Sequence, residues 1–136
     1  MKVPPEKLFL MADDDDDDCI LAHTAFRESG AEGTLACVSN GVELLEYLGS
    51  QDAPLPCLIL LDLNMPRKDG REALKEIKSS PAIADIPIVI LTTSREQKDI
   101  ETSMQNGATA FITKPETFGK WVEIMRCLRK AWLEAV

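Results

Sequence analysis

The chain has 136 residues, of which 45% are hydrophobic and 28% charged, an ordinary composition for a soluble domain with one hydrophobic core. Its formal net charge of −8 argues against binding to nucleic-acid phosphates and against docking on anionic membranes. No apolar run approaches the roughly 20 residues that span a bilayer. Residues 1–7 contain no apolar signal segment, which predicts a cytoplasmic protein.

Short apolar runs alternate with amphipathic segments along the whole chain. After a tail at residues 1–7, strands are expected at 8–12, 34–38, 57–62, 86–91 and 109–113. Helices are expected at 19–28, 42–48, 71–78, 95–105 and 117–133. This alternation predicts an α/β fold with a five-stranded parallel sheet, helices on both faces and the flavodoxin-like strand order 2-1-3-4-5. We see no linker or repeat, so residues 8–136 are expected to form a single domain.

The expected helix starts have polar residues that suit capping. Six aspartates occupy residues 13–18, and we expect residues 16–18 to supply the N-cap and first-turn charges of the first helix. The role of Asp15 stays open at this point. Residues 92–94, Thr-Thr-Ser, are expected to cap the helix at 95–105.

The cysteines are far apart in the sequence, at Cys19, Cys37, Cys57 and Cys127. They form no Cys-x-x-Cys pair, and the chain has one histidine, His23, which lies off the apolar stripe of its helix. We therefore expect reduced, mostly buried thiols rather than a zinc site or a disulfide framework. His23 is expected to lie at the surface.

Polar side chains stand where the predicted strands end. Asp13 and Asp14 follow the first strand, Asp62 ends the third, Thr92 follows the fourth and Lys114 the fifth. Because the carboxyl ends of parallel strands meet at one edge of a sheet, these side chains are expected to converge. Three carboxylates in one place repel one another, and Mg²⁺ with oxygen ligands would resolve this conflict. A metal, an ammonium, a hydroxyl and a carboxylate nucleophile are what phosphoryl transfer requires.

Four elements in this order resemble the receiver domain of two-component response regulators. They are the Asp13-Asp14 pair, L-D-L-N-M-P-R-K-D-G at 61–70, L-T-T-S at 91–94 and G-A-T-A-F-I-T-K-P at 107–115. The resemblance covers about residues 8–134. The motifs look most like those of the small stand-alone regulators that partner cyanobacterial phytochrome-type histidine kinases.

The resemblance implies a role for each matching residue. Asp62 would accept a phosphoryl group from the phosphohistidine of a sensor histidine kinase. Asp13, Asp14, Asp62 and the backbone carbonyl of Asn64 would bind Mg²⁺.

The remaining matching residues would sense the phosphoryl group. Lys114 would contact its oxygens, the Thr92 hydroxyl would turn toward it, and Phe111 would take the aromatic switch position. The face formed by the fourth helix, fifth strand and fifth helix would then shift. With no output domain in view, the signal would pass through a downstream protein or through homodimer formation. Slow autophosphatase activity is expected, without turnover of other substrates.

Three other functions fit parts of the pattern. A Mg²⁺-dependent phosphohydrolase with an aspartyl-phosphate intermediate is the main alternative, but Asn64 stands where such enzymes commonly have a second acid. A degenerate receiver acting only as an adaptor is disfavoured by the intact set of site residues. A flavin-binding role fits the fold, but the acidic mouth of the site would repel the phosphate of FMN.

Overall fold

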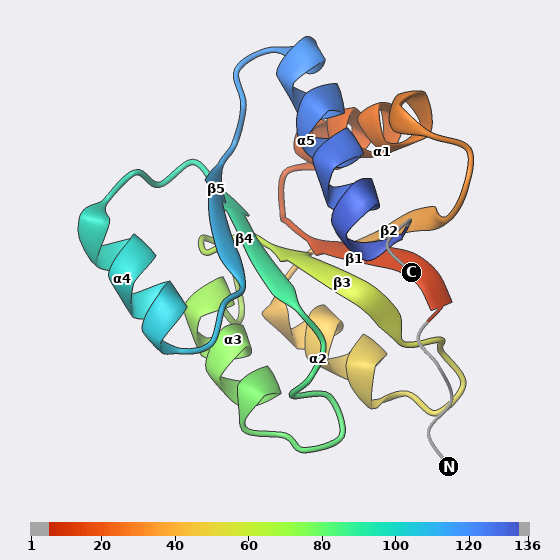
Figure 1. The fold of residues 1–136 in the computed structure, drawn as a ribbon. Coiled ribbons are helices and arrows are strands. Elements are labelled where there is room, and N and C mark those ends of the chain that lie inside the picture. Colours follow the sequence, from red (N-terminus) through yellow and green to blue (C-terminus); the bar gives the residue numbers. More distant parts are fainter. Residues whose placement is uncertain (1–5, 134–136) are drawn as a thin grey trace.

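Five parallel strands form one sheet in the order β2-β1-β3-β4-β5 (Figure 1). The computed structural model describes residues 6–133. The strands are β1 (Glu6–Ala12), β2 (Thr34–Val38), β3 (Pro56–Leu61), β4 (Ile88–Thr92) and β5 (Ala110–Thr113). The helices are α1 (Asp16–Ser29), α2 (Gly41–Gly49), α3 (Gly70–Lys78), α4 (Gln97–Gln105) and α5 (Phe118–Trp132). The predicted α/β fold and strand order are confirmed.

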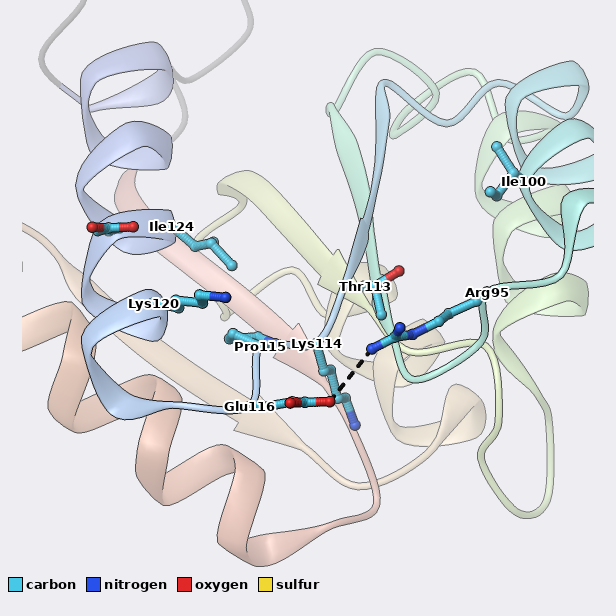
Figure 2. Close-up of a pocket in the computed structure, with 9 residues that line it drawn as sticks. Arg95, Ile100, Thr113, Lys114, Pro115, Glu116, Lys120 and Ile124 are labelled. Atoms are coloured by element: carbon cyan, nitrogen blue, oxygen red, sulfur yellow. Dashed lines mark ion pairs between the residues drawn. The ribbon is translucent and has the colours of Figure 1, made fainter.

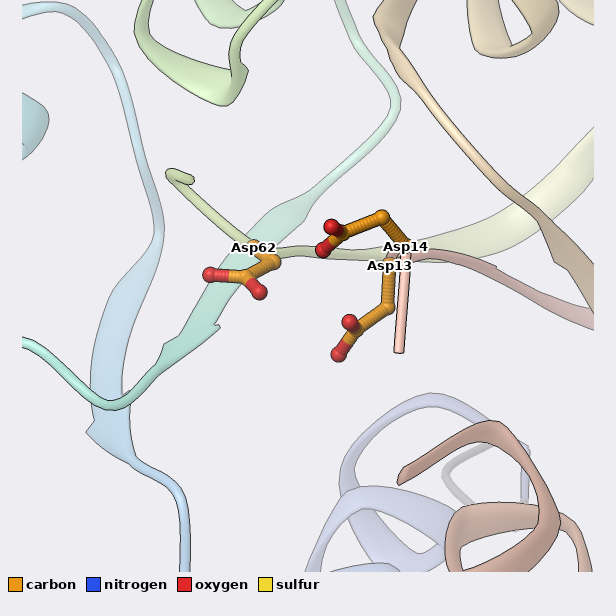
Figure 3. Close-up of side chains that lie close together, drawn as sticks. All are labelled: Asp13, Asp14 and Asp62. Atoms are coloured by element: carbon orange, nitrogen blue, oxygen red, sulfur yellow. The ribbon is translucent and has the colours of Figure 1, made fainter. Parts of the chain in front are cut away.

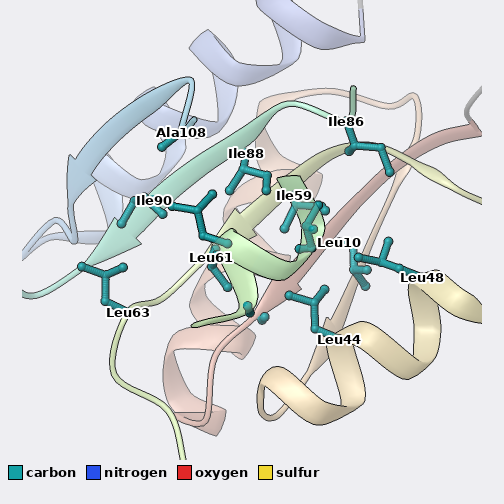
Figure 4. Close-up of a cluster of buried hydrophobic side chains, with 14 of the residues drawn as sticks. Leu10, Leu44, Leu48, Ile59, Leu61, Leu63, Ile86, Ile88, Ile90 and Ala108 are labelled. Carbon is teal, nitrogen blue, oxygen red and sulfur yellow. The ribbon is translucent and has the colours of Figure 1, made fainter. Parts of the chain in front are cut away.

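The central strand β3 is buried on both faces, which explains its uninterrupted apolar sequence. Leu58 and Leu60 pack into a cluster with α1 and α5, whereas Ile59 and Leu61 pack into a cluster with α2 and α3 (Figure 4). All four side chains have no exposed surface. Burial of each contributes about 2 kcal/mol to stability, so this strand is a rigid support for the residue that follows it.

The first helix begins earlier than predicted, because the aspartate run supplies its own cap. The N-cap is Asp15, whose Oδ1 accepts hydrogen bonds from the backbone N–H groups of Asp17 (2.9 Å) and Asp18 (3.3 Å). The prediction that the cap falls within residues 16–18 is therefore wrong by one residue. Residues 16–18 do form the first turn, where negative charge favours the helix dipole.

The predicted cap of α4 is also wrong. The strand β4 continues through Thr92, which pairs with Thr113 of β5, so Thr92 cannot cap a helix. The helix starts at Gln97, and its N-cap Glu96 makes no side-chain capping bond. The Ser94 hydroxyl instead donates a hydrogen bond to Asp99 Oδ2 at 2.7 Å, which ties the β4–α4 loop to the first turn of the helix.

Other boundaries shift by one or two residues. The strand β1 starts at Glu6, inside the predicted tail, whose residues 1–5 lie outside the described part of the chain. The strand β3 ends at Leu61, so Asp62 is the first residue beyond it. β4 starts at Ile88, directly after Pro87, which has no N–H to donate to a ladder.

The four cysteines are free thiols, as predicted, but they are less buried than expected. Cys37 and Cys127 are exposed, and Cys19 and Cys57 are intermediate. Cys37 lies on β2, one of the two edge strands of the sheet. His23 is exposed, as predicted. Within residues 6–133, no helix has both the length and the apolar character needed to cross a bilayer.

Candidate functional site

The carboxylates of Asp13, Asp14 and Asp62 converge where β1 and β3 end (Figure 3). One oxygen from each lies within 4.8 Å of the others. The strand ends are joined directly, because the Asp62 backbone N–H donates to the carbonyl of Ala12 at 3.0 Å. This is the point where the strand order reverses, and the predicted convergence of the three residues is confirmed.

The three carboxylates differ in their access to water. Asp13 and Asp62 are buried, with 2% and 6% of their surface exposed, whereas Asp14 is exposed. Burial raises the pKa of Asp13 to about 6, because the charged form loses hydration. The nearby ammonium of Lys114 opposes this shift, and the negative charge of Asp62 adds to it. The cluster therefore carries negative charge that one lysine does not neutralise.

Lys114 reaches this cluster from the end of β5. Its Nζ lies 2.8 Å from Asp13 Oδ2 and 3.1 Å from Asp62 Oδ2. Burial alone would lower the pKa of Lys114, but the carboxylates of Asp13 and Asp18 outweigh it and raise that pKa above the usual range. The ammonium is thus held charged beside Asp62, where it can attract an anionic group.

The donor set of the cluster fits a hard divalent cation. It offers three carboxylate oxygens, and Mg²⁺ prefers oxygen ligands. Among residues 6–133, Asp13 Oδ2 has no aligned hydrogen-bond donor, its contact with Lys114 being an ion pair. Asn64 follows Asp62 closely, and its backbone N–H donates to Asp62 Oδ1 at 3.3 Å. The Asn64 N–H therefore lies beside the carboxylate, and the ligand role of the Asn64 carbonyl stays a prediction.

Thr92 lies at the neighbouring strand end with its hydroxyl unsatisfied. The residue has no exposed surface, and its Oγ1 has no hydrogen-bond partner within the described chain. The Thr92 carbonyl accepts from the Lys114 backbone N–H at 2.7 Å, which fixes the two residues side by side. The Thr92 hydroxyl is therefore a donor without a local acceptor. Leaving a buried hydroxyl in this state costs about 1–3 kcal/mol.

Phe111 is half-buried in β5 and packs against the core cluster shared with α2 and α3. This contact is ordinary core packing. Its predicted role as a switch stays a prediction.

The structure adds an acidic residue that the sequence reasoning did not place in the site. Asp18 Oδ2 lies 2.7 Å from Lys114 Nζ, although the two residues are 96 positions apart in the chain. One sequence signal could have found Asp18. The first turn of a helix that directly follows a strand lies at the same edge of the sheet as the strand end.

A second network missed from the sequence links the site to α4. The Arg71 guanidinium makes a bidentate pair with Asp99 and also donates to Asn64 Oδ1 at 3.4 Å. Asp99 in turn accepts from Ser94 in the β4–α4 loop. Nothing in the sequence pattern indicated that α3 and α4 would be paired in this way.

Comparison with known proteins assigns the family. Residues 9–126 match the response regulator receiver domain. This chain is a receiver domain of the two-component response regulator family. Members of this family are phosphoacceptor signalling domains, which receive phosphoryl groups from histidine kinases. The resemblance inferred from the sequence motifs is therefore confirmed.

The similar proteins include small regulators of nearly the same length. Response regulator Rcp1 from Synechocystis sp. is 34% identical over 97% of this chain and 92% of its own length. The crystal structure of its Mn²⁺-bound form superposes with a TM-score of 0.86 at 33% identity, covering 97% of both chains. The phosphorylated cyanobacterial phytochrome response regulator RcpA superposes with a TM-score of 0.88 at 34% identity, covering 98% of this receiver and 97% of RcpA.

Proposed function

We propose that Asp62 is the residue that accepts the phosphoryl group. Its carboxylate is buried at the end of β3, between the Lys114 ammonium and the acidic pair at the end of β1. This convergence is the observation that carries the proposal. An Asp62 oxygen attacks the phosphorus of the kinase phosphohistidine and the P–N bond breaks. The bonding electrons stay on the imidazole, which takes up a proton, and an acyl phosphate forms on Asp62.

Asp13, Asp14, Asp62 and the Asn64 carbonyl would hold Mg²⁺ in this receiver. Their hard oxygens and uncompensated charge support the assignment, as does the Mn²⁺-bound form of the relative Rcp1. A cation held there would supply positive charge that lowers the repulsion between the carboxylates and an incoming phosphoryl group. Lys114 supplies the second positive charge, and the Thr92 hydroxyl supplies a hydrogen-bond donor once it turns toward the phosphoryl group.

The signal would leave through the face formed by α4, β5 and α5. An open groove of about 670 Å³ lies on this face, between the Arg95–Glu116 ion pair and the first turns of α5 (Figure 2). Thr92 and Phe111 belong to the strands beneath it, so a change at the phosphoryl site can alter its shape. A downstream protein or a second copy of the chain would read this change. Sedimentation with and without beryllofluoride tests self-association, and identical profiles would exclude phosphorylation-dependent dimers.

The kinase would be of the phytochrome type. The similarity to RcpA, which is a phytochrome response regulator, supports this assignment. Phosphotransfer from a panel of histidine kinases tests it, and we expect the fastest transfer from a phytochrome-type kinase. Equal rates across the panel would contradict this assignment.

The acyl phosphate on Asp62 would be hydrolysed slowly, and phosphoesters would not be turned over. A phosphohydrolase is disfavoured because Asn64, which is no acid, stands two residues after Asp62. Repeated turnover of a phosphomonoester would overturn this conclusion.

The central experiment is incubation with Mg²⁺ and acetyl phosphate, followed by intact mass measurement. We expect one added phosphoryl group on the wild-type chain and none on Asp62→Asn. The matched control is Asp52→Asn, which removes an equal charge from an exposed loop and should leave the adduct unchanged. An adduct that persists in Asp62→Asn, or a wild-type chain that binds Mg²⁺ but takes up no phosphoryl group, would refute the proposal.

A further inference from the structure

The ammonium of Lys114 is surrounded by three carboxylates. Its Nζ contacts Asp18 Oδ2 at 2.7 Å, Asp13 Oδ2 at 2.8 Å and Asp62 Oδ2 at 3.1 Å. Its hydrogen bonds go to Asp18 and Asp62, while the contact with Asp13 is an ion pair without an aligned N–H. A phosphoryl group on Asp62 must compete with these partners for the ammonium.

The three partners differ in what they would lose. The Asp13 side chain is fully buried, and the Asp62 side chain has 7% of its surface exposed. Both belong to the proposed Mg²⁺ ligand set, so the metal would replace Lys114 as their counterion. The Asp18 side chain is 21% exposed, so water can hydrate its carboxylate when the lysine moves away. Asp18 lies outside the proposed metal set, so in the Mg²⁺-loaded site it is the partner with which a phosphoryl group competes for Lys114.

The position of Asp18 is set by the helix that carries it. The Asp15 cap binds its backbone N–H and fixes the first turn of α1 at the edge of the sheet. Asp17 precedes it in the same turn and is exposed, with no ion pair to Lys114 among the residues described. The two aspartates thus carry the same charge at neighbouring positions, but only Asp18 contacts the lysine.

We propose that Asp18 is a positioning residue that holds Lys114 in the unphosphorylated receiver and competes with the phosphoryl group for its ammonium. This inference rests on the proposed function, because it takes Asp62 as the acceptor. Asp18 steadies Lys114 beside Asp62 before transfer and weakens its hold on the phosphoryl group afterwards. The affinity of the site for a phosphoryl group is then set partly by a residue outside the acceptor and metal-binding set.

The test measures the affinity of the Mg²⁺-loaded chain for beryllofluoride, a stable mimic of the phosphoryl group, by NMR titration. Removal of the competitor in Asp18→Asn should tighten binding by about fivefold, the scale of one partly exposed ion pair. Asp18→Glu keeps an anion within reach of Lys114 and should restore an affinity close to that of the wild type. Asp17→Asn removes the same charge without removing the contact and should change the affinity by less than about twofold.

A second readout does not depend on the metal or on phosphorylation. In EDTA, Asp18→Asn should shift the Lys114 side-chain resonances, whereas Asp17→Asn should leave them in place. This separates loss of the contact from a general change of charge.

The outcomes distinguish this inference from the proposed function. A wild-type chain that binds no beryllofluoride would overturn the proposed function and the role of Asp18 with it. If the wild type binds but Asp18→Asn binds equally or more weakly, only the competition by Asp18 is overturned. Equal effects of Asp17→Asn and Asp18→Asn would likewise overturn it, because general electrostatics would then account for both.

Discussion

Arg71 of α3 and Asp99 of α4 form a bidentate ion pair that connects the two helices. The two residues are 28 positions apart in the chain. Arg71 Nη2 lies 3.0 Å from both Asp99 oxygens, and Arg71 Nε lies 3.2 Å from Oδ1. The pKa of Asp99 is lowered, first by the hydrogen bond from Ser94 and then by Arg71. Because Arg71 also reaches Asn64, the pair links the candidate metal site to the β4–α4 loop.

Loss of this pair should loosen the β4–α4 loop with little effect on global stability. Arg71→Lys cannot reproduce the bidentate geometry, so amide exchange in residues 93–100 should become faster. The free energy of unfolding should fall by less than about 1 kcal/mol, because the Arg71 side chain is 37% exposed. Hydrogen exchange followed by mass spectrometry measures the first effect and urea unfolding the second.

The control for this prediction is Arg95→Gln. It breaks the Arg95–Glu116 pair, whose side chains are 72% and 82% exposed, and should not alter exchange in the loop. Unchanged exchange in Arg71→Lys would show that the Arg71–Asp99 pair does not hold the loop.

Gly70 is required for close packing beneath Asp62. Its backbone N–H donates to the Leu63 carbonyl at 2.9 Å, and a Cβ at this position would lie 2.0 Å from the Asp62 carbonyl oxygen. Gly70→Ala should therefore lower the free energy of unfolding by about 3 kcal/mol and displace the Asp62 main chain. Urea unfolding measures the loss of stability, and Mg²⁺ titration measures the damage to the site.

Gly119 offers a matched substitution in α5. A Cβ there meets no atom within 4 Å, so Gly119→Ala should be neutral or stabilise the chain by up to about 1 kcal/mol through its higher helix propensity. If both alanine variants were equally stable, the close approach at Gly70 would not matter.

Metal-free stability should depend on pH through Asp13. The pKa of Asp13 is about 6 in the folded chain, above its ordinary value of 3.8, so the folded chain binds the proton more tightly than the unfolded chain. This contribution to stability is complete below pH 4 and is lost as the pH rises through 6, and it amounts to about 3 kcal/mol at most. In EDTA, Asp13→Asn should therefore lose less stability than the wild type between pH 4 and pH 7. Parallel unfolding curves for the two chains would contradict this.

The same proton should compete with Mg²⁺. A ligand carboxylate must be ionised to bind the cation, so the Mg²⁺ affinity of the wild type should fall as the pH drops below about 6. Calorimetric titration at several pH values measures this. An affinity that stays constant from pH 5 to pH 8 would show that Asp13 does not titrate in this range.

Arg129 of α5 should be essential for stability, because it donates hydrogen bonds to backbone carbonyls at the C-terminal end of α1 and just beyond it. The residue is 2% exposed, and its guanidinium donates to the carbonyls of Phe26, Gly30 and Glu32 and to the Ser29 hydroxyl. It also lies over the Phe26 ring, 3.8 Å from the centroid. Arg129→Met would leave buried carbonyls without donors and should cost at least about 3 kcal/mol, measured by urea unfolding.

The control for this prediction is Arg126→Met on the same helix. Arg126 is exposed, so its replacement should change the unfolding free energy by less than about 0.5 kcal/mol. A comparable loss in both variants would mean that general charge, rather than the capping of α1, explains the effect.

Much of the site could be predicted because its residues stand at strand ends. Asp13, Asp62 and Lys114 directly follow β1, β3 and β5. In a parallel sheet these positions meet at one edge, whatever the loops do. The helix starts were harder, as Asp15 and Glu96 show, because several neighbouring polar residues could each serve as the cap.

Local sequence patterns were enough to predict the order of strands and helices, the burial of β3 on both faces and the edge of the sheet that carries the acidic residues and Lys114. These features follow from local apolar periodicity and from the residues that end each strand. The pairing of Asp18 with Lys114 across 96 residues, and of Arg71 with Asp99 across 28, became visible in the folded chain. Such pairings depend on where helix turns lie relative to the sheet, and periodicity does not determine this to within the reach of a side chain.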